Sequence, residues 1–479
     1  MAATQTADIR AVLGGGSAED RVAATHLVVG ALFLVLGSAL AVLSFFALRF
    51  GDLFPISYGR IEPIANLTLV IGFCVISLVG GVYYVLPRLT GARLWNSRLA
   101  GLGLLGMAGL VLAGDLAVAL GLGSGRQPFG LPWWIDLPML GVLSVPFLIV
   151  SRTIANREEK HSYVTIWFVL GGVTWLPLLY ATHVAGHAPF LSTLAIAYND
   201  LFLSSGLITM VVITLGSGLF YYTVVRELDI ALASRQLALV GFWSLGFASV
   251  WWGTAQLIFG PGPGWLAGVA AALGLAFPIG ALANAANVSL TLEGSWGDLS
   301  DRPGVSAGVF GLFLAVGVGA LAALGGFRSI ASVAALTSFW ESIEYASVAG
   351  VGALLVAGVS FSALPRLTGR EIASRDRARS FSRLTVIGSV GVVIFLTAAG
   401  LYNGYAWIGG ANSAAFVNAG EGWGAGVGAT ADTLLLLALA FSVVAFMGHL
   451  AYASTILGTL VRGRAIPQEI LVAREADDE

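Results

Sequence analysis

The stretch from Tyr58 to Trp95 reads YGRIEPIANLTLVIGFCVISLVGGVYYVLPRLTGARLW, and it decides the fold class. It opens with a short polar turn and then stays apolar for more than 20 residues, which is about the length that a membrane-spanning helix needs. Tyr83 and Tyr84 precede the letters LPRLTG at residues 86–91, and tyrosines followed by an arginine are typical of a cytoplasmic helix end. We therefore predict a transmembrane helix that ends near Pro87, because proline interrupts the helical hydrogen-bond ladder.

The end of this helix has a repeated sequence. Residues 364–369 give the same six letters, LPRLTG, after another apolar run, and residues 220–226, FYYTVVR, close a third run. Three unrelated helices could end alike, but an identity of six residues is more than that explanation needs. The pattern therefore indicates an internal repeat of three related spans.

The composition is that of a polytopic membrane protein. Of the 479 residues, 57% are hydrophobic and 10% are charged, and a soluble domain of this size cannot bury so much apolar surface. Cys74 is the single cysteine and lies in an apolar run, so we expect a small core residue and no disulfide within the chain. The net charge of −2 gives no sign of nucleic-acid binding.

Twelve apolar runs are long enough to span a bilayer. They lie near residues 23–48, 62–86, 98–122, 132–153, 162–182, 198–225, 236–259, 264–290, 305–325, 343–365, 383–403 and 429–461. We predict an all-α membrane protein with a twelve-helix transmembrane domain over residues 23–461. Residues 1–22 are expected to form a cytoplasmic N-terminal segment, and residues 462–479 a cytoplasmic tail.

The arginines predict the orientation. If both termini are cytoplasmic, only four of the 24 basic residues lie on the outer side, which leaves 20 on the cytoplasmic side. The four are Arg49, Arg60, Arg126 and Arg328. This bias follows the positive-inside rule, and we expect a multi-pass protein of a prokaryotic cytoplasmic membrane.

Acidic residues within the predicted spans are candidate functional groups, because intramembrane acids are costly. The candidates are Glu62, Asp115, Asp200, Glu341, Glu344 and Asp432. An acid at a helix start can instead act as a cap near the positive end of the helix dipole. We expect Asp200 and Asp432 to be caps. Both roles stay open for Glu341 and Glu344, which lie beside Tyr345 at the start of the tenth span.

Two histidines, His183 and His187, are four residues apart, a spacing that can place two metal ligands on one helix face. They are weak candidates for a metal site, and we otherwise expect no metal. His26, His161 and His449 stand singly in or beside spans. We expect these three to be structural hydrogen-bonding residues.

The ordered motifs resemble subunit I of the heme-copper oxidases, most closely the C-family (the cbb-type, FixN-like branch). They are Tyr58-Gly59-Arg60 through Arg88, residues 133–136, residues 160–164 with Trp167-Phe168, residues 220–226, Phe242-Trp243, Trp251-Trp252-Gly253, residues 291–296 and residues 364–371. The resemblance covers the chain from about His26 to Arg464. It implies twelve helices in three arcs around a pseudo-threefold axis.

The resemblance also implies six histidine ligands for two hemes and a copper ion, and this chain departs from it. The heme-ligand positions fall on Ala65, Ile343 and Tyr345, and the copper-ligand positions on Ser205, Ala255 and Gln256. None of the six is a histidine. The chain contains five histidines in all, so it cannot supply six under any alignment.

The side chains at these six positions are poor ligands for heme iron and copper. Heme iron is bound by imidazole, thiolate, thioether or phenolate, and copper of this kind by imidazole. Only Tyr345 could bind a heme iron, and Ala65 would give it no opposing ligand. The space must then hold bulky side chains, water or another ligand, since large cavities are costly. A candidate polar site near it consists of Asn66, Gln256, Glu341, Glu344 and Tyr345.

Three functions stay open. The chain could be a non-catalytic membrane scaffold or anchor of a respiratory or redox complex. It could instead bind and transport protons, cations or a quinone, or it could be an active terminal oxidase or nitric oxide reductase with atypical ligands. We expect no cofactor, with heme left open. The expected partners are the lipid bilayer and protein subunits of a redox complex, and no nucleic acid.

Overall fold

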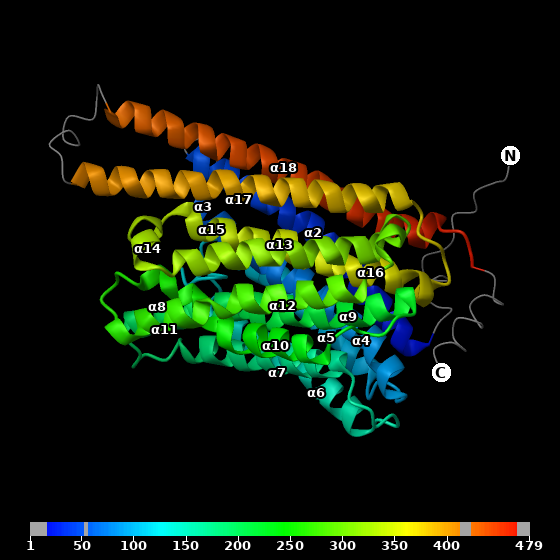
Figure 1. Ribbon diagram of the computed structural model, residues 1–479. Helices are drawn as coiled ribbons and strands as arrows, with labels where there is room; N and C mark the ends of the chain where they lie inside the picture. The colour runs from blue at the N-terminus through cyan, green and yellow to red at the C-terminus, as the bar shows by residue number, and fades with distance from the viewer. Residues whose placement is uncertain (1–16, 52–55, 412–422, 467–479) are drawn as a thin grey trace.

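The computed structural model describes residues 17–51, 56–411 and 423–466 of the chain. Over these ranges it contains twelve helices that are long and apolar enough to cross a membrane (Figure 1). The predicted all-α fold with twelve spans is confirmed. The expected cytoplasmic segments at residues 1–22 and 462–479 lie mostly outside the described residues.

Seven spans are single α-helices. They are α2 (Ala18–Arg49), α5 (Ser97–Ala119), α6 (Trp133–Ala155), α7 (Val164–Ala185), α13 (Pro303–Gly325), α17 (Arg375–Ala411) and α18 (Trp423–Arg462). Two short helices, η5 (Trp296–Ser300) and α14 (Arg328–Ala334), lie in connections.

The other five spans change helix type or break along their length. The second span is α3 (Tyr58–Leu67), η2 (Thr68–Val75) and α4 (Ile76–Thr90), and the sixth is α8 (Thr193–Gly206), η3 (Leu207–Ile213) and α9 (Thr214–Leu228). The tenth is α15 (Ser338–Tyr345), η6 (Ala346–Gly352) and α16 (Ala353–Thr368). The seventh is α10 (Arg235–Gly246) with η4 (Ala248–Leu257), and the eighth is α11 (Gly264–Gly274) with α12 (Ala276–Thr291).

The second, sixth and tenth spans form the centre of the bundle. In their most apolar 18-residue windows 100, 89 and 94% of residues are buried, against at most 56% in any other described span. Each contains a π-helical segment at mid-length, and these segments, η2, η3 and η6, contact one another in pairs. The repeat predicted from the helix ends is therefore visible in the structure. The three spans each have a π-helical segment between two α-helices, and they pack around one axis.

Glycines allow these three helices to approach closely. A Cβ on Gly352 of η6 would lie 2.8 Å from Sγ of Cys74 in η2 and 3.1 Å from a methyl of Val212 in η3. A Cβ on Gly81 of α4 would likewise lie 2.9 Å from Leu219 and 3.2 Å from Val359, in the other two spans. Small residues at these levels therefore hold the central helices together by direct packing, and Cys74 is a buried core residue as expected.

The repeated sequence produces repeated helix ends. Gly91 and Gly369, the last residues of the two LPRLTG motifs, have φ angles of 64° and 63°, and Asp229 after α9 has a φ of 52°. Glycine takes this left-handed conformation without a steric penalty. The second span ends near Pro87 as predicted, but the proline does not interrupt it, since α4 continues to Thr90 with Pro87 inside it. A proline removes only one ladder hydrogen bond, and here the helix continues past it.

Candidate functional site

Three of the six predicted ligand positions line cavities. Ala65 on α3 and Tyr345 on α15 line one cavity of about 40 Å³. Gln256, at the end of η4, lines a larger cavity of about 720 Å³. Tyr58, Thr193 and Ser338 begin the three central spans and line this larger cavity too, so it lies where those spans start.

The other three ligand positions are part of the packed interior. Ser205, Ala255 and Ile343 are at most 1% exposed. The Ser205 hydroxyl lies within hydrogen-bond distance of two backbone carbonyls, that of Leu201 at 2.8 Å and that of Val250, and its one proton is shared between them. These three side chains are packed in the interior. Ala255 and Ile343 have no ligand atom, and a serine hydroxyl is a poor replacement for the imidazole that copper of this kind prefers.

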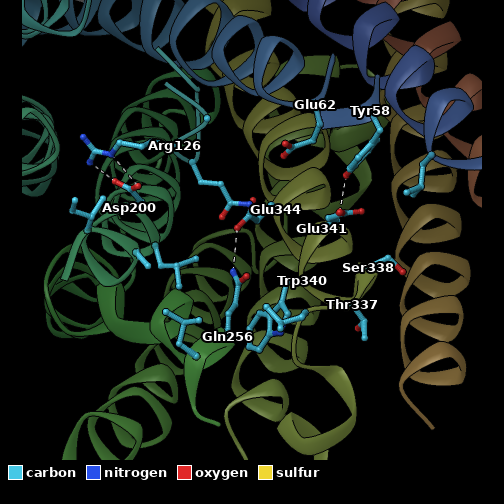
Figure 2. Close-up of a pocket in the computed structure, with 18 of the residues that line it drawn as sticks. Tyr58, Glu62, Arg126, Asp200, Gln256, Thr337, Ser338, Trp340, Glu341 and Glu344 are labelled. Carbon is cyan, nitrogen blue, oxygen red and sulfur yellow. Dashed lines mark hydrogen bonds and ion pairs between the residues drawn. The ribbon is translucent and has the colours of Figure 1, made fainter. Parts of the chain in front are cut away.

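Carboxylates gather beside the cavities (Figure 2). Glu62 on α3 and both Glu341 and Glu344 on α15 line the 720 Å³ and 40 Å³ cavities. The Tyr58 hydroxyl donates to Oε1 of Glu341 at 2.6 Å, and the Asn66 amide donates to Oε1 of Glu62 at 2.5 Å. The predicted polar residues of the second and tenth spans are thus brought together.

Glu344 connects the tenth span to the sixth and seventh spans. Its Oε1 accepts hydrogen bonds from Ser204 of α8 at 3.2 Å and from the Gln256 amide at 3.4 Å. Its side chain lines the two cavities already described and a third, of about 20 Å³, which Asn66 also lines. We call the three cavities with Glu62, Glu341 and Glu344 the carboxylate chamber.

The carboxylate chamber has an excess of negative groups. Among the described residues that line its three cavities, Arg126 is the one basic side chain. The Arg126 guanidinium is already paired with Asp200, its Nη2 lying 2.5 Å from Oδ1 and its Nε 3.2 Å from Oδ2. The three glutamates therefore lack a described positive partner, and buried carboxylates without one must be protonated or take up a cation.

A second polar cluster adjoins the chamber through Asp200. Nδ1 of His183 on α7 lies 3.0 Å from Oδ1 of Asp200, and Nε2 of His183 lies 3.6 Å from Oδ2 of Asp136 on α6. Nε2 of His187 lies 2.7 Å from the same Asp136 oxygen. The expectation that Asp200 is a helix cap is wrong, because it lies in the second half of α8 and pairs with Arg126.

The remaining acids have single described partners. Asp432 is not a helix cap either, since it lies within α18 and Oδ2 is 3.0 Å from Nη2 of Arg49. Oδ2 of Asp115 accepts a hydrogen bond of 2.9 Å from the Thr68 hydroxyl. Glu341 is in the first turn of α15, where the helix dipole favours a negative charge. It therefore lies at a helix start and also lines the carboxylate chamber.

Comparison with known proteins identifies the family. Residues 21–423 match the family model described as Cytochrome C and Quinol oxidase polypeptide I. The chain belongs to the heme-copper oxidase subunit I family. This confirms the resemblance seen in the sequence motifs, and the twelve-helix architecture agrees with it.

The family relatives are distant in sequence. A Rhodobacter capsulatus protein named cytochrome c oxidase subunit 1 is 22% identical over 380 residues, which cover 74% of this chain and 68% of the relative. A cytochrome c oxidase subunit 1 homolog of Azorhizobium caulinodans is 25% identical over 385 residues, covering 74% of this chain and 66% of the relative. The cbb3-type cytochrome c oxidase subunit CcoN1 of Stutzerimonas stutzeri is 25% identical over 378 residues, covering 73% and 76%.

The donor set of this family member does not fit two hemes and a copper ion held by imidazoles. His26 and His449 are buried, with ring nitrogens 2.7 and 2.9 Å from backbone carbonyls, as expected of structural residues. His161 is exposed, and His183 and His187 belong to the cluster around Asp136. No histidine is found among the described residues that line the carboxylate chamber.

Several residues of these sites were not predicted as site residues from the sequence. Tyr58 and Ser204 bind the glutamates of the chamber, and Arg126 and Asp136 organise the second cluster. Tyr58 opens the stretch that decides the fold, and Asp136 closes a motif that carries the family resemblance. These sequence positions did not predict the hydrogen-bond partners. Glu341, the partner of Tyr58, is 283 residues away in the chain. Tyr180 and His187, the partners of Asp136, are 44 and 51 residues away.

Proposed function

We propose that this chain is a non-catalytic membrane subunit of a respiratory or redox complex, which keeps the family fold without reducing oxygen itself. The observation that carries the proposal is the donor set. The six positions where the family resemblance implies imidazole ligands hold Ala65, Ile343, Tyr345, Ser205, Ala255 and Gln256. Of these side chains only the phenol of Tyr345 is a usual ligand of heme iron.

The packing of these residues supports the proposal. Ile343 and Ala255 are integral to the main hydrophobic core, and the Ser205 hydroxyl is used in hydrogen bonds to backbone. The Tyr345 ring packs against Phe45, with 5.2 Å between the ring centroids. A scaffold or anchor needs this stable bundle and an interface to partner subunits, and it needs no ligand at the six positions.

The test is turnover by the purified chain. The protein is reconstituted alone in liposomes, and reduction of oxygen and of nitric oxide is measured with an artificial electron donor. We expect no turnover above empty liposomes. The Stutzerimonas stutzeri relative, prepared in the same way with its own subunits, is the positive control. Turnover by this chain would overturn the proposal and would favour an oxidase or reductase with atypical ligands.

The carboxylate chamber supports a second candidate function, the binding and transport of protons or cations. Glu62, Glu341 and Glu344 lie together without a described positive partner. Carboxylate oxygens are the groups that carry protons and bind hard cations in membrane proteins. A quinone headgroup is the other ligand that such a chamber could hold, through hydrogen bonds to its polar side chains.

This second function is tested by ion flux into liposomes. We expect Glu344→Gln to abolish proton or cation flux, because the amide keeps a hydrogen-bond acceptor for Ser204 and loses the charge. Glu293→Gln, at an exposed glutamate, is the matched control and should leave the flux unchanged. Equal flux in the two variants, or no flux in the original protein, would contradict transport. Binding of a quinone analogue that Glu344→Gln weakens would then identify the chamber as a quinone site.

A further inference from the structure

We infer that Asp136, His183 and His187 form a binding site for a divalent transition-metal ion, and that Zn²⁺ is the ion that the site fits. The three residues come from α6, α7 and the segment that follows α7. They are separate from the six positions of the heme and copper ligands. This inference therefore does not rest on the proposed function.

The ligand atoms converge on one small volume. One ligand atom each of Asp136, His183 and His187 lies within 4.8 Å of the other two. Nε2 of His183 and Nε2 of His187 lie 3.6 and 2.7 Å from Oδ2 of Asp136, and the shorter contact is a hydrogen bond that a bound ion would replace. Tetrahedral zinc with bonds of about 2.0–2.1 Å holds its ligands about 3.3 Å apart, so small side-chain rotations would close the site. The 3.6 Å between His183 Nε2 and Asp136 Oδ2 is too long for a hydrogen bond, which leaves this ring nitrogen available to an ion.

The groups behind the ligands orient them for a metal. Nδ1 of His183 lies 3.0 Å from the Asp200 carboxylate, which only accepts hydrogen bonds when ionised and so favours a proton on Nδ1 and a lone pair on Nε2. Nη2 of Arg126 also lies 3.3 Å from this Nδ1, but it makes its shorter contact of 2.5 Å with Asp200. The Tyr180 hydroxyl donates to Oδ1 of Asp136 at 2.6 Å, which leaves Oδ2 facing the two histidines. A carboxylate behind a histidine is the usual arrangement around zinc.

The charges of the cluster also favour a cation. The Asp136 side chain is 0% exposed, and the described groups around it are Tyr180 and the two histidines. Arg126 does not neutralise it, because its charge is paired with Asp200. With neutral histidines, the cluster keeps one buried negative charge, which is costly without a counter-charge. A divalent ion supplies that charge and uses the histidines as ligands in the same step.

The site is reachable and has room for a further ligand. The His187 side chain is 21% exposed, so an ion can enter from the surface beside it. Three protein ligands leave the fourth zinc position for water. Because Arg126 and Asp200 line the 720 Å³ cavity, a metal bound here would fix α6 and α7, and through Asp200 also α8, at the rim of the carboxylate chamber.

The experiment measures zinc binding to the purified full-length chain, with any affinity tag removed and bound metal stripped by a chelator. We expect one Zn²⁺ per chain by calorimetry and elemental analysis. X-ray absorption should show imidazole and oxygen ligands at about 2.0–2.1 Å. His187→Ala is expected to weaken binding by more than tenfold. Tyr180→Phe should weaken it by about 10- to 100-fold, as expected for a residue that orients a ligand.

His161→Ala is the matched control, because it removes an exposed histidine from outside the cluster and should leave zinc binding unchanged. His187 is partly exposed, so its substitution should not prevent folding, and gel filtration checks this for each variant. Failure of the original protein to bind zinc stoichiometrically would overturn the inference, and so would equal binding by His187→Ala. In that case a proton on His183 would be the counter-charge of Asp136.

Discussion

The ion pair between Arg126 and Asp200 gives the sharpest prediction of stability. The two side chains are 13% and 7% exposed, and two hydrogen bonds of 2.5 and 3.2 Å join them. The substitution Arg126→Gln leaves the Asp200 carboxylate buried, with His183 as its remaining described partner. Removing one member of a buried pair costs about 3–5 kcal/mol, because the other charge stays buried without compensation.

A surface pair in the same chain provides the reference. Nη2 of Arg379 lies 3.5 Å from Asp301, whose side chain is 74% exposed. The substitution Asp301→Asn should therefore cost less than about 1 kcal/mol, as exposed pairs do. The double substitution Arg126→Gln with Asp200→Asn removes both buried charges and should recover most of the stability lost in the single variant.

The assay is unfolding of the purified protein in mixed detergent micelles, followed by tryptophan fluorescence. The expected order of stability is Asp301→Asn near the original protein, then the double variant, then Arg126→Gln. If Arg126→Gln were no less stable than Asp301→Asn, the pair would not be the buried contact that its geometry indicates. If the double variant were as unstable as the single one, the loss would come from packing and not from an unpaired charge.

Two further predictions concern the centre of the bundle, and the same unfolding assay measures both. Gly352→Ala should destabilise the protein by about 1–3 kcal/mol through overpacking, because the added Cβ would lie 2.8 Å from Sγ of Cys74. The control Gly317→Ala adds a Cβ with no atom within 4 Å and should instead stabilise the protein by about 0.5–1 kcal/mol. Equal effects of the two substitutions would argue against close packing of the three central spans. Tyr58→Phe removes the 2.6 Å hydrogen bond to Glu341 and should lower the stability of the protein by about 1–3 kcal/mol. Adding Glu341→Gln should recover this stability. No loss of stability in Tyr58→Phe would show that the Glu341 carboxylate is solvated and not held by Tyr58.

The sequence was a good guide to the spans and to their repetition. Long apolar runs report helices directly, because the bilayer requires every backbone group to be hydrogen-bonded within its own span. The π-helical segments η2, η3 and η6 were not predicted, since they are composed mostly of apolar residues and hydropathy does not distinguish helix types. The passage of α4 through Pro87 was missed because a proline is a local signal for a helix end, and the surrounding structure can override such a propensity.

The site was predicted only in part. The glutamates of the tenth span were recognised because acids in an apolar run are costly, and they do line a chamber together with Glu62. The error at Asp200 has a different cause. An acid near the start of a span resembles a cap in sequence, and its partner Arg126 is 74 residues away, in the connection between α5 and α6. Such a contact follows from the packing of helix ends, which a single sequence does not encode locally.

We propose that this member of the heme-copper oxidase subunit I family holds neither heme nor copper at the positions of the family's ligands. The most direct measurement is an optical spectrum with iron and copper analysis of the purified chain, expressed in a host that supplies both cofactors. The account predicts no Soret band and no stoichiometric iron or copper, whether or not zinc is present. A Soret band with one iron per chain that disappears in Tyr345→Phe would contradict it.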